Sequence, residues 1–190
     1  MRTNRQYACL LILLLLSWLL AAREGPRIIG FTPEDYAGQP QNWAFAQDSL
    51  GNLYAANSGR ILRFDGVRWT KFQLPGNPIV RSICMHNGKL YAGGYGEFGY
   101  FQDLHAATPE YISLSDQFFG PERMREEIWH IEALDDTAMV FQSFGRLFVF
   151  DTKSVKEITP PGTLMFMQKW QDHLLVPVTE QGVFSWRPKQ

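Results

Sequence analysis

A glycine followed by an aromatic residue returns four times along this chain of 190 residues. The glycines are separated by 37, 49 and 37 residues. A period of roughly 20 to 50 residues is typical of stacked or radial structural units, because one such unit cannot bury its apolar face alone. We therefore expect an array of repeated units. The glycine and aromatic pairs are Gly59 and Phe64, Gly96 and Phe101, Gly145 and Phe150, and Gly182 and Trp186.

Each copy contains short apolar segments separated by Gly, Asp and Asn, the pattern of a meander of β-strands. In the first copy, strands are expected at residues 43–46, 53–56, 61–64 and 69–72. In the second, Asn87-Gly88 is a strong signal for a tight hairpin, because both residues tolerate positive φ. The predicted units span approximately residues 41–78, 79–116, 127–161 and 162–190.

Four-stranded units of about 40 residues that end in an aromatic residue are typical of propeller blades. The predicted fold is therefore an all-β β-propeller with about four four-stranded blades, as part of a larger propeller. A β-sandwich is the alternative, since its turns have a similar spacing. The second unit carries about twelve extra residues, placed between His105 and Glu127, where Ser115–Glu127 could hold one helical turn.

The N-terminus has the pattern of a secretory signal peptide. Arg2 and Arg5 precede an apolar run from Tyr7 to Leu20, and Ala21 and Ala22 are small residues that a signal peptidase accepts. Residues 1–22 are therefore predicted to be the signal peptide and residues 23–190 the repeat region. An uncleaved membrane anchor is the alternative, although the run is shorter than a spanning helix needs. Both interpretations place the repeats outside the cytoplasm.

Composition excludes several classes of function. Eighteen basic and nineteen acidic residues, with no block of Lys or Arg, predict no direct binding of nucleic acid. Cys84 is alone after the signal peptide, so no internal disulfide is expected, and its apolar neighbours predict a buried position. The four histidines lack metal-ligand spacing, and no metal or cofactor is expected. Adjacent carboxylates such as Glu126 and Glu127 point to opposite faces of a strand, so no catalytic residues are predicted.

One rim of the predicted array is a candidate ligand-binding face. The loop between the second and third strands of every blade reaches this rim, and its residues combine aromatic rings with Asn, Gln, Glu and Arg. Such a combination suits a small polar ligand, for example an oligosaccharide, because rings stack on it and polar groups orient its hydroxyls. The alternative is that these side chains are solvated or pack between blades. The candidates are Asn57, Arg60, Tyr95, Glu97, Gln142, Phe144, Arg146 and Glu180, whereas Trp43 and Trp129 are expected in the core.

Several short runs between Ile28 and Phe101 match one known class of repeat. They are FTPEDY at 31–36, QNW at 41–43, AQD at 46–48, FDG at 64–66, VRS at 80–82, YAGG at 91–94 and EFGYF at 97–101. In these runs the chain resembles the N-terminal sensory region of two-component-regulator propeller proteins, known chiefly from Bacteroidetes. From Ile128 to Trp186 the similarity extends only to the repeat pattern.

The resemblance implies an exported propeller array followed by a three-tyrosine β-sandwich, one membrane span and a cytoplasmic output module. That module is a histidine kinase or a helix-turn-helix DNA-binding domain. The chain would then be the periplasmic ligand-sensing portion of a receptor, truncated before its output module, and it would not itself be an enzyme. Membrane association would come from a downstream span or an uncleaved signal, and a homodimer is compatible with this class. The alternatives are a small secreted β-propeller binding protein and, third, a propeller-class hydrolase or lyase.

Overall fold

The computed structural model describes Tyr7 and residues 28–120 and 125–187. Residues Met1–Phe31 and Thr32–Gln190 form separate units, and every described strand belongs to the second. The predicted signal peptide, residues 1–22, lies outside the described residues apart from Tyr7. In the described part of the chain, no helix combines the length and the apolar character needed to cross a membrane.

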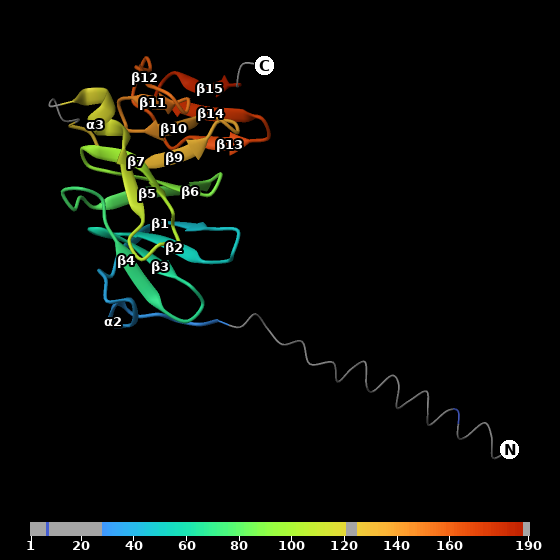
Figure 1. Ribbon diagram of the computed structural model, residues 1–190. Helices are drawn as coiled ribbons and strands as arrows, with labels where there is room; N and C mark the ends of the chain where they lie inside the picture. The colour runs from blue at the N-terminus through green and yellow to red at the C-terminus, as the bar shows by residue number, and fades with distance from the viewer. Residues whose placement is uncertain (1–6, 8–27, 121–124, 188–190) are drawn as a thin grey trace. The chain divides into compact units, whose positions relative to one another are not determined.

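The second unit consists of four antiparallel sheets that follow one another in chain order (Figure 1). The first contains β1 (Asn42–Gln47), β2 (Leu53–Asn57), β3 (Arg60–Phe64) and β4 (Trp69–Phe72). The second contains β5 (Val80–His86), β6 (Lys89–Gly94), β7 (Glu97–Gln102) and β8 (Glu110–Ser113). The third contains β9 (His130–Ala133), β10 (Met139–Gln142), β11 (Leu147–Phe150) and β12 (Val155–Ile158). The fourth, within the described residues, contains β13 (Gln168–Trp170), β14 (His173–Val178) and β15 (Gly182–Trp186).

Each sheet is a meander whose strands pair only with their neighbours in sequence. The first strands of the first three sheets lie side by side, since β5 contacts both β1 and β9. We call the first strand of each sheet its innermost strand. The predicted all-β fold of propeller blades is confirmed. The sheets are called blades 1 to 4 below.

The turns between strands follow from the residues that the sequence places there. Asn87 and Gly88, between β5 and β6, have φ values of 48° and 71°. Asp65 and Asp151 each begin a turn between the third and fourth strands and accept hydrogen bonds from backbone N–H groups two and three residues later. Such Asx turns fix the chain reversal locally in blades 1 and 3.

Burial between blades provides the core. Blades 1 and 2 enclose a cluster that includes Tyr54, Ile61 and Leu90, with Phe101 behind them. Blades 2 and 3 enclose a mainly aromatic cluster, in which the ring centroids of Phe98 and Phe148 are 5.1 Å apart. Blades 3 and 4 enclose aliphatic side chains. Their buried members are Leu134, Ala138, Val140, Leu147, Val149, Leu164, Met167, Leu174, Val176 and Val178.

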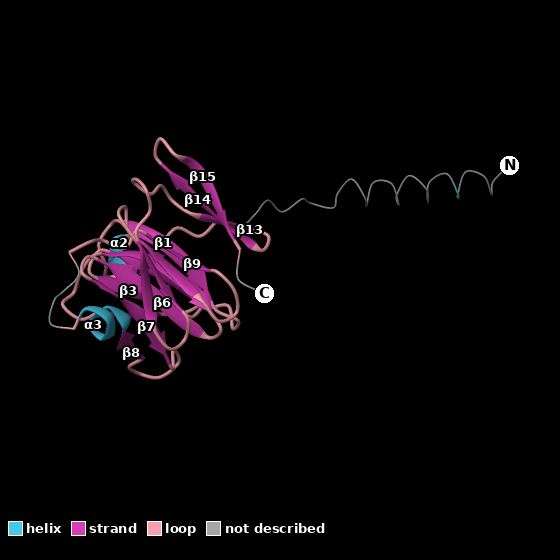
Figure 2. Ribbon diagram, turned by 90° about the horizontal axis from the view of Figure 1, so that it is seen from above, coloured by secondary structure: helices cyan, strands magenta, loops and turns pink. Residues whose placement is uncertain are grey.

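Two short helices cover parts of the blades. α2 (Pro33–Tyr36) places Tyr36 against Leu62 and Trp69, so it covers part of the outer face of blade 1. α3 (Leu114–Phe119) begins at Ser113, whose hydroxyl accepts a hydrogen bond from the backbone of Asp116. This helix lies against β7 (Figure 2) and occupies the region where one helical turn was expected.

The lone thiol of residues 23–190 is only partly buried. Cys84 lies on β5 and packs at the edge of the cluster between blades 2 and 3. Burial raises the pKa of its thiol to about 11, so the thiol is neutral at physiological pH. It therefore behaves as a small packing residue.

Gly99 is predicted to be indispensable for the pairing of β7 with β8. A Cβ at this position would lie 2.1 Å from the carbonyl oxygen of Ile112, a backbone atom that cannot rotate away. Gly99→Ala should lower the free energy of unfolding by about 1 to 3 kcal/mol, the range for overpacking. Urea denaturation followed by circular dichroism measures this change.

Gly145→Ala is the matched control, because a Cβ there would meet only Glu126 at an ordinary contact distance of 3.4 Å. Equal stability of the two variants would show that β7 and β8 do not approach each other as described.

Candidate ligand-binding face

Each blade carries one large side chain near the start of its innermost strand. Trp43 is the extra residue of a bulge between the pairs Asn42↔Asn57 and Ala44↔Ala56. Arg81 occupies the same place in β5, where the register shifts between Val80 and Ser82. A bulge turns its extra side chain away from the regular alternation of the strand. These two residues are therefore displayed at the ends of their strands.

Blades 3 and 4 use a residue that precedes the strand. Trp129 precedes β9, and its backbone N–H donates to the carbonyl oxygen of Gln142 at 2.8 Å. Phe166 lies two residues before β13, at the corresponding point of the fourth repeat. All four blades thus contribute one large side chain at equivalent positions.

Arg81 lies between two tryptophans from the neighbouring blades. Its guanidinium carbon is 3.8 Å from the ring centroid of Trp43 and 4.8 Å from that of Trp129. Contacts of this kind, between a cation and the faces of aromatic rings, are favourable, and more so where water is excluded. Arg81 therefore connects blades 1, 2 and 3 through a single side chain.

The charge of Arg81 is compensated by a carboxylate. Its Nε donates to Oε1 of Glu127 at 2.5 Å, and the two side chains are 14% and 20% exposed. Its Nη1 is buried and has no hydrogen-bond partner among the described residues. The guanidinium therefore keeps a donor nitrogen that no described residue uses.

The aromatic surface continues toward blade 4 and becomes more exposed. The ring of Phe144 lies 5.3 Å from Trp129 and 6.1 Å from Phe166. Phe144 and Phe166 are 40% and 47% exposed. We call Trp43, Arg81, Trp129, Phe144 and Phe166 the inner-strand cluster.

Paired charges lie beside the inner-strand cluster. Arg146 contacts Oε1 of Glu126 at 2.9 Å and Oε1 of Glu157 at 3.4 Å. The hydroxyl of Ser143 donates to Glu126 and accepts from the backbone of Arg146. Both arginines of this face are thus held by carboxylates, so the surface offers fixed donors and acceptors with little net charge.

The structure brings some of the predicted site residues to this face. Phe144 belongs to the inner-strand cluster, and Arg146 lies beside it. Tyr95 is 59% exposed, and its backbone forms a bridge with Glu127, the partner of Arg81. Glu180 lies apart, exposed in the turn between β14 and β15 with φ of 63°.

Two other predicted ligand residues are buried and serve the fold. The amide of Asn57 accepts from the backbone N–H of Gln39 at 2.9 Å and donates to its carbonyl oxygen at 2.7 Å. The amide of Gln142 donates to the carbonyl oxygen of Met165 at 2.7 Å and accepts from the N–H of Met167 at 2.9 Å. Each side chain takes the place of a backbone strand partner, and Gln142 thereby connects blade 3 to blade 4.

Glu97, also a predicted ligand residue, is a buried carboxylate. Its Oε1 accepts hydrogen bonds from the hydroxyls of Tyr111, Ser113 and Ser115 at 2.8 to 2.9 Å. Burial raises the pKa of Glu97, and these hydrogen bonds oppose that rise without cancelling it. The carboxylate thus ties β7 to β8 and to the start of α3.

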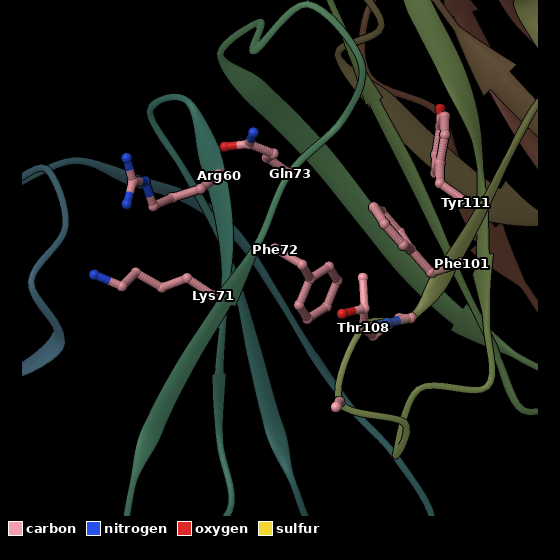
Figure 3. Close-up of a pocket in the computed structure, with 9 residues that line it drawn as sticks. Arg60, Lys71, Phe72, Gln73, Phe101, Thr108 and Tyr111 are labelled. Carbon is pink, nitrogen blue, oxygen red and sulfur yellow. The ribbon is translucent and has the colours of Figure 1, made fainter.

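Arg60 lines a different hollow, a cavity of about 390 Å³ between the outer strands of blades 1 and 2. Figure 3 shows the side chains of Arg60 and Lys71 extending away from the rings of Phe72 and Phe101. The ammonium of Lys71 donates instead to the carbonyl oxygen of Ala37 at 3.1 Å. The cations therefore do not converge on this cavity. Its other lining residues are Gln73, Ala107, Thr108, Pro109 and Tyr111.

Sequence reasoning missed Arg81 and Phe166 and placed Trp43 and Trp129 in the core. Both tryptophans are only partly buried, because they lie at strand ends and not within the blade faces. The signal that could have found the set is positional: residues 43, 81, 129 and 166 recur at intervals of 38, 48 and 37. Within the described ranges, no group of three or more His, Cys, Asp or Glu residues could hold a metal ion.

Comparison with known proteins gives matches in structure alone. No protein family and no curated protein matches the sequence. The extracellular domain of the putative hybrid two component system BT4673 from B. thetaiotaomicron aligns with a TM-score of 0.68 at 12% identity, over 85% of this chain and 23% of that one. That of BT3049, from the same organism, aligns with a TM-score of 0.66 at 12% identity, over 85% and 25%.

A designed protein has a similar architecture. The computationally designed Ika4 protein aligns with a TM-score of 0.60 at 12% identity, over 77% of this chain and 91% of its own. These likenesses show the fold. The present chain spans about a quarter of the two extracellular domains, and those neighbours are consistent with the resemblance of the sequence to sensory propellers.

The raised pKa of Glu97 predicts a specific pH dependence of stability. Because the folded chain binds this proton more tightly than the unfolded chain does, the contribution of Glu97 is most favourable below its unfolded pKa of about 4.3. It declines as the pH rises through the folded pKa. Glu97→Gln keeps the accepting oxygen without the charge, so its stability relative to the wild type should increase between pH 4 and pH 7.

Urea denaturation at both pH values measures this difference. Glu110→Gln is the control, because it removes an exposed carboxylate from the neighbouring strand β8. A constant difference between Glu97→Gln and the wild type across this range would contradict the buried carboxylate.

Proposed function

We propose that this chain is the ligand-sensing propeller portion of an exported signal-transduction receptor or transcriptional regulator, facing the periplasm. The inner-strand cluster is the proposed binding surface for a small polar ligand such as an oligosaccharide. One observation carries the proposal: equivalent positions of all four blades deliver Trp43, Arg81, Trp129 and Phe166 to the same face. Both structural neighbours from B. thetaiotaomicron are extracellular domains of such systems, which supports a sensory role without enzyme activity.

The chemistry of the face suits a polyhydroxylated ligand. The exposed rings of Phe144 and Phe166 can stack on the apolar faces of a sugar ring. The nearby pair of Arg146 and Glu126 can donate to and accept from its hydroxyls. Because Arg81 and Arg146 already contact carboxylates, an uncharged ligand avoids repulsion from Glu126 and Glu127.

The inner-strand cluster exists only when the four blades are assembled, so ligand binding depends on the folded array. Since its side chains come from four blades, a ligand on the cluster contacts residues that are distant in sequence. A ligand that binds only the assembled blades stabilises the folded chain by mass action. We therefore expect binding to raise the melting temperature of the chain.

The test begins with a panel of neutral and acidic oligosaccharides screened by the change in tryptophan fluorescence, because Trp43 and Trp129 belong to the cluster. For each hit, calorimetry gives the dissociation constant of the wild type and of Phe144→Ala combined with Phe166→Ala. Removing both stacking rings should weaken binding about tenfold or more, since each tenfold change corresponds to about 1.4 kcal/mol.

Phe118→Ala is the matched control. Phe118 is 38% exposed, similar to Phe144, but it lies on α3 and packs against Phe119. Unchanged affinity in the double variant, or an equal loss in Phe118→Ala, would refute the inner-strand cluster as the binding surface.

A further inference from the structure

One ion pair controls the charge of the inner-strand cluster beside its tryptophans. Trp43 and Trp129 stand at 75° to each other with ring centroids 6.2 Å apart, and the guanidinium of Arg81 lies in the corner that they form. Among the described residues, Glu127 is the carboxylate that contacts this guanidinium, at 2.5 Å. The positive charge beside the two tryptophans is therefore balanced by a single described side chain.

The backbone holds Glu127 in place. Glu127 itself forms a bridge with Tyr95. On either side of it, the carbonyl oxygen of Glu126 accepts a backbone hydrogen bond at 2.9 Å, and the N–H of Ile128 donates one at 3.1 Å. Their backbone partners, at the turn between β6 and β7, are Gly96 and Gly94. The segment that carries Glu127 is thus fixed to blade 2, so its carboxylate is a fixed counter-ion for Arg81.

The other arginine of this face is more exposed and has two carboxylate partners. Arg146 contacts both Glu126 and Glu157, and its side chain is 41% exposed. The side chain of Arg81 is 14% exposed. Because buried charges are screened less by salt than exposed ones, the charge balance at Arg81 has the larger effect on a ligand.

A carboxylate in this position acts on a ligand through its charge. An acidic ligand beside Arg81 would also face Glu127, and like charges brought together cost enough to exclude a wrong partner. A neutral ligand does not meet this repulsion. Without Glu127 the guanidinium would attract acidic groups, and its buried Nη1 has no partner among the described residues.

We propose that Glu127 sets the charge specificity of the inner-strand cluster, which binds neutral oligosaccharides and rejects acidic ones such as those built from uronic acids. This role for Glu127 rests on the proposed function of the cluster as a saccharide-binding surface. Glu127 acts through Arg81, because the two side chains form an internal ion pair without net charge. Removal of the carboxylate alone should shift the preference toward acidic oligosaccharides.

Fluorescence quenching tests this control of charge without any saccharide. Iodide is an anion and acrylamide is neutral, and both quench tryptophan, so a comparison of the two reports the charge near Trp43 and Trp129. Glu127→Gln keeps an oxygen that can accept a hydrogen bond from Arg81 but removes the negative charge. In the whole chain, this variant should raise the quenching constant of iodide and leave that of acrylamide unchanged.

Two further variants serve as controls. Glu110→Gln removes an exposed carboxylate that accepts a hydrogen bond from Gln102 at 2.6 Å, and it should leave both quenching constants unchanged. Arg81→Gln combined with Glu127→Gln removes both charges of the pair and should return iodide quenching to the wild-type value. Circular dichroism establishes that each variant is folded. Equal iodide quenching of the wild type and Glu127→Gln would overturn the proposal.

Calorimetry with two saccharides of different charge then measures the specificity. The probes are the trimer of galacturonic acid and the neutral galactose trimer that is made from it by reduction of the carboxyl groups. Glu127→Gln should bind the acidic trimer at least about tenfold more tightly than the wild type does. Its affinity for the neutral trimer should change little.

Equal measurable affinity of the wild type and Glu127→Gln for the acidic trimer would overturn the proposal. Binding of the neutral trimer alone by Glu127→Gln would also overturn it. If neither trimer binds any variant but iodide quenching responds as expected, the proposed saccharide site fails, whereas the control of Arg81 by Glu127 is supported.

Discussion

The burial of one blade face on the next is the constraint on which this structure depends. Within residues 28–120 and 125–187, each sheet has three or four short strands, too few to bury an apolar face on its own. The aromatic cluster around Phe98 and Phe148, and its counterparts on either side, supply what the single sheet lacks. The close approach of β7 to β8 leaves no space for a side chain at Gly99. Where blades 3 and 4 meet, the side-chain amide of Gln142 takes the place of a backbone hydrogen-bond partner.

The candidate site arises from the same geometry. Alternate residues of the strands pack between blades. Residues at strand ends and at bulges fall outside this alternation, so their side chains can point elsewhere. Arg81 and Trp43 occupy such bulges, and Phe166 lies two residues before its strand. The face that they form therefore arises where the strands begin, and Trp43 also packs against the core between blades 1 and 2.

Much of the architecture can be predicted from the sequence, because strands and turns depend on residues that are close together in the chain. The strands follow from apolar alternation, and turns such as Asn87-Gly88 follow from residues that accept positive φ. The candidate site is harder to predict, because a sequence does not show where a bulge shifts the register. Nothing in the sequence distinguishes Arg81 from other residues in the middle of a strand. The sequence predicts Asn57 and Glu97 as ligand residues, whereas the structure buries both among internal hydrogen bonds to residues that are 18 positions away in the chain.

The most direct test of the central role of blade burial uses Cys84, which packs at the junction of blades 2 and 3. Pulse labelling with a thiol reagent across a urea gradient, read by mass spectrometry of the peptide containing Cys84, reports when this junction opens. Because Cys84 is only partly buried, the readout is the rise of labelling above its level in the native chain. If blade faces hold the array together, this rise should occur at the same urea concentration as the loss of β-structure seen by circular dichroism. A rise at urea concentrations where the circular dichroism is still native would show that the junction is not what maintains the fold.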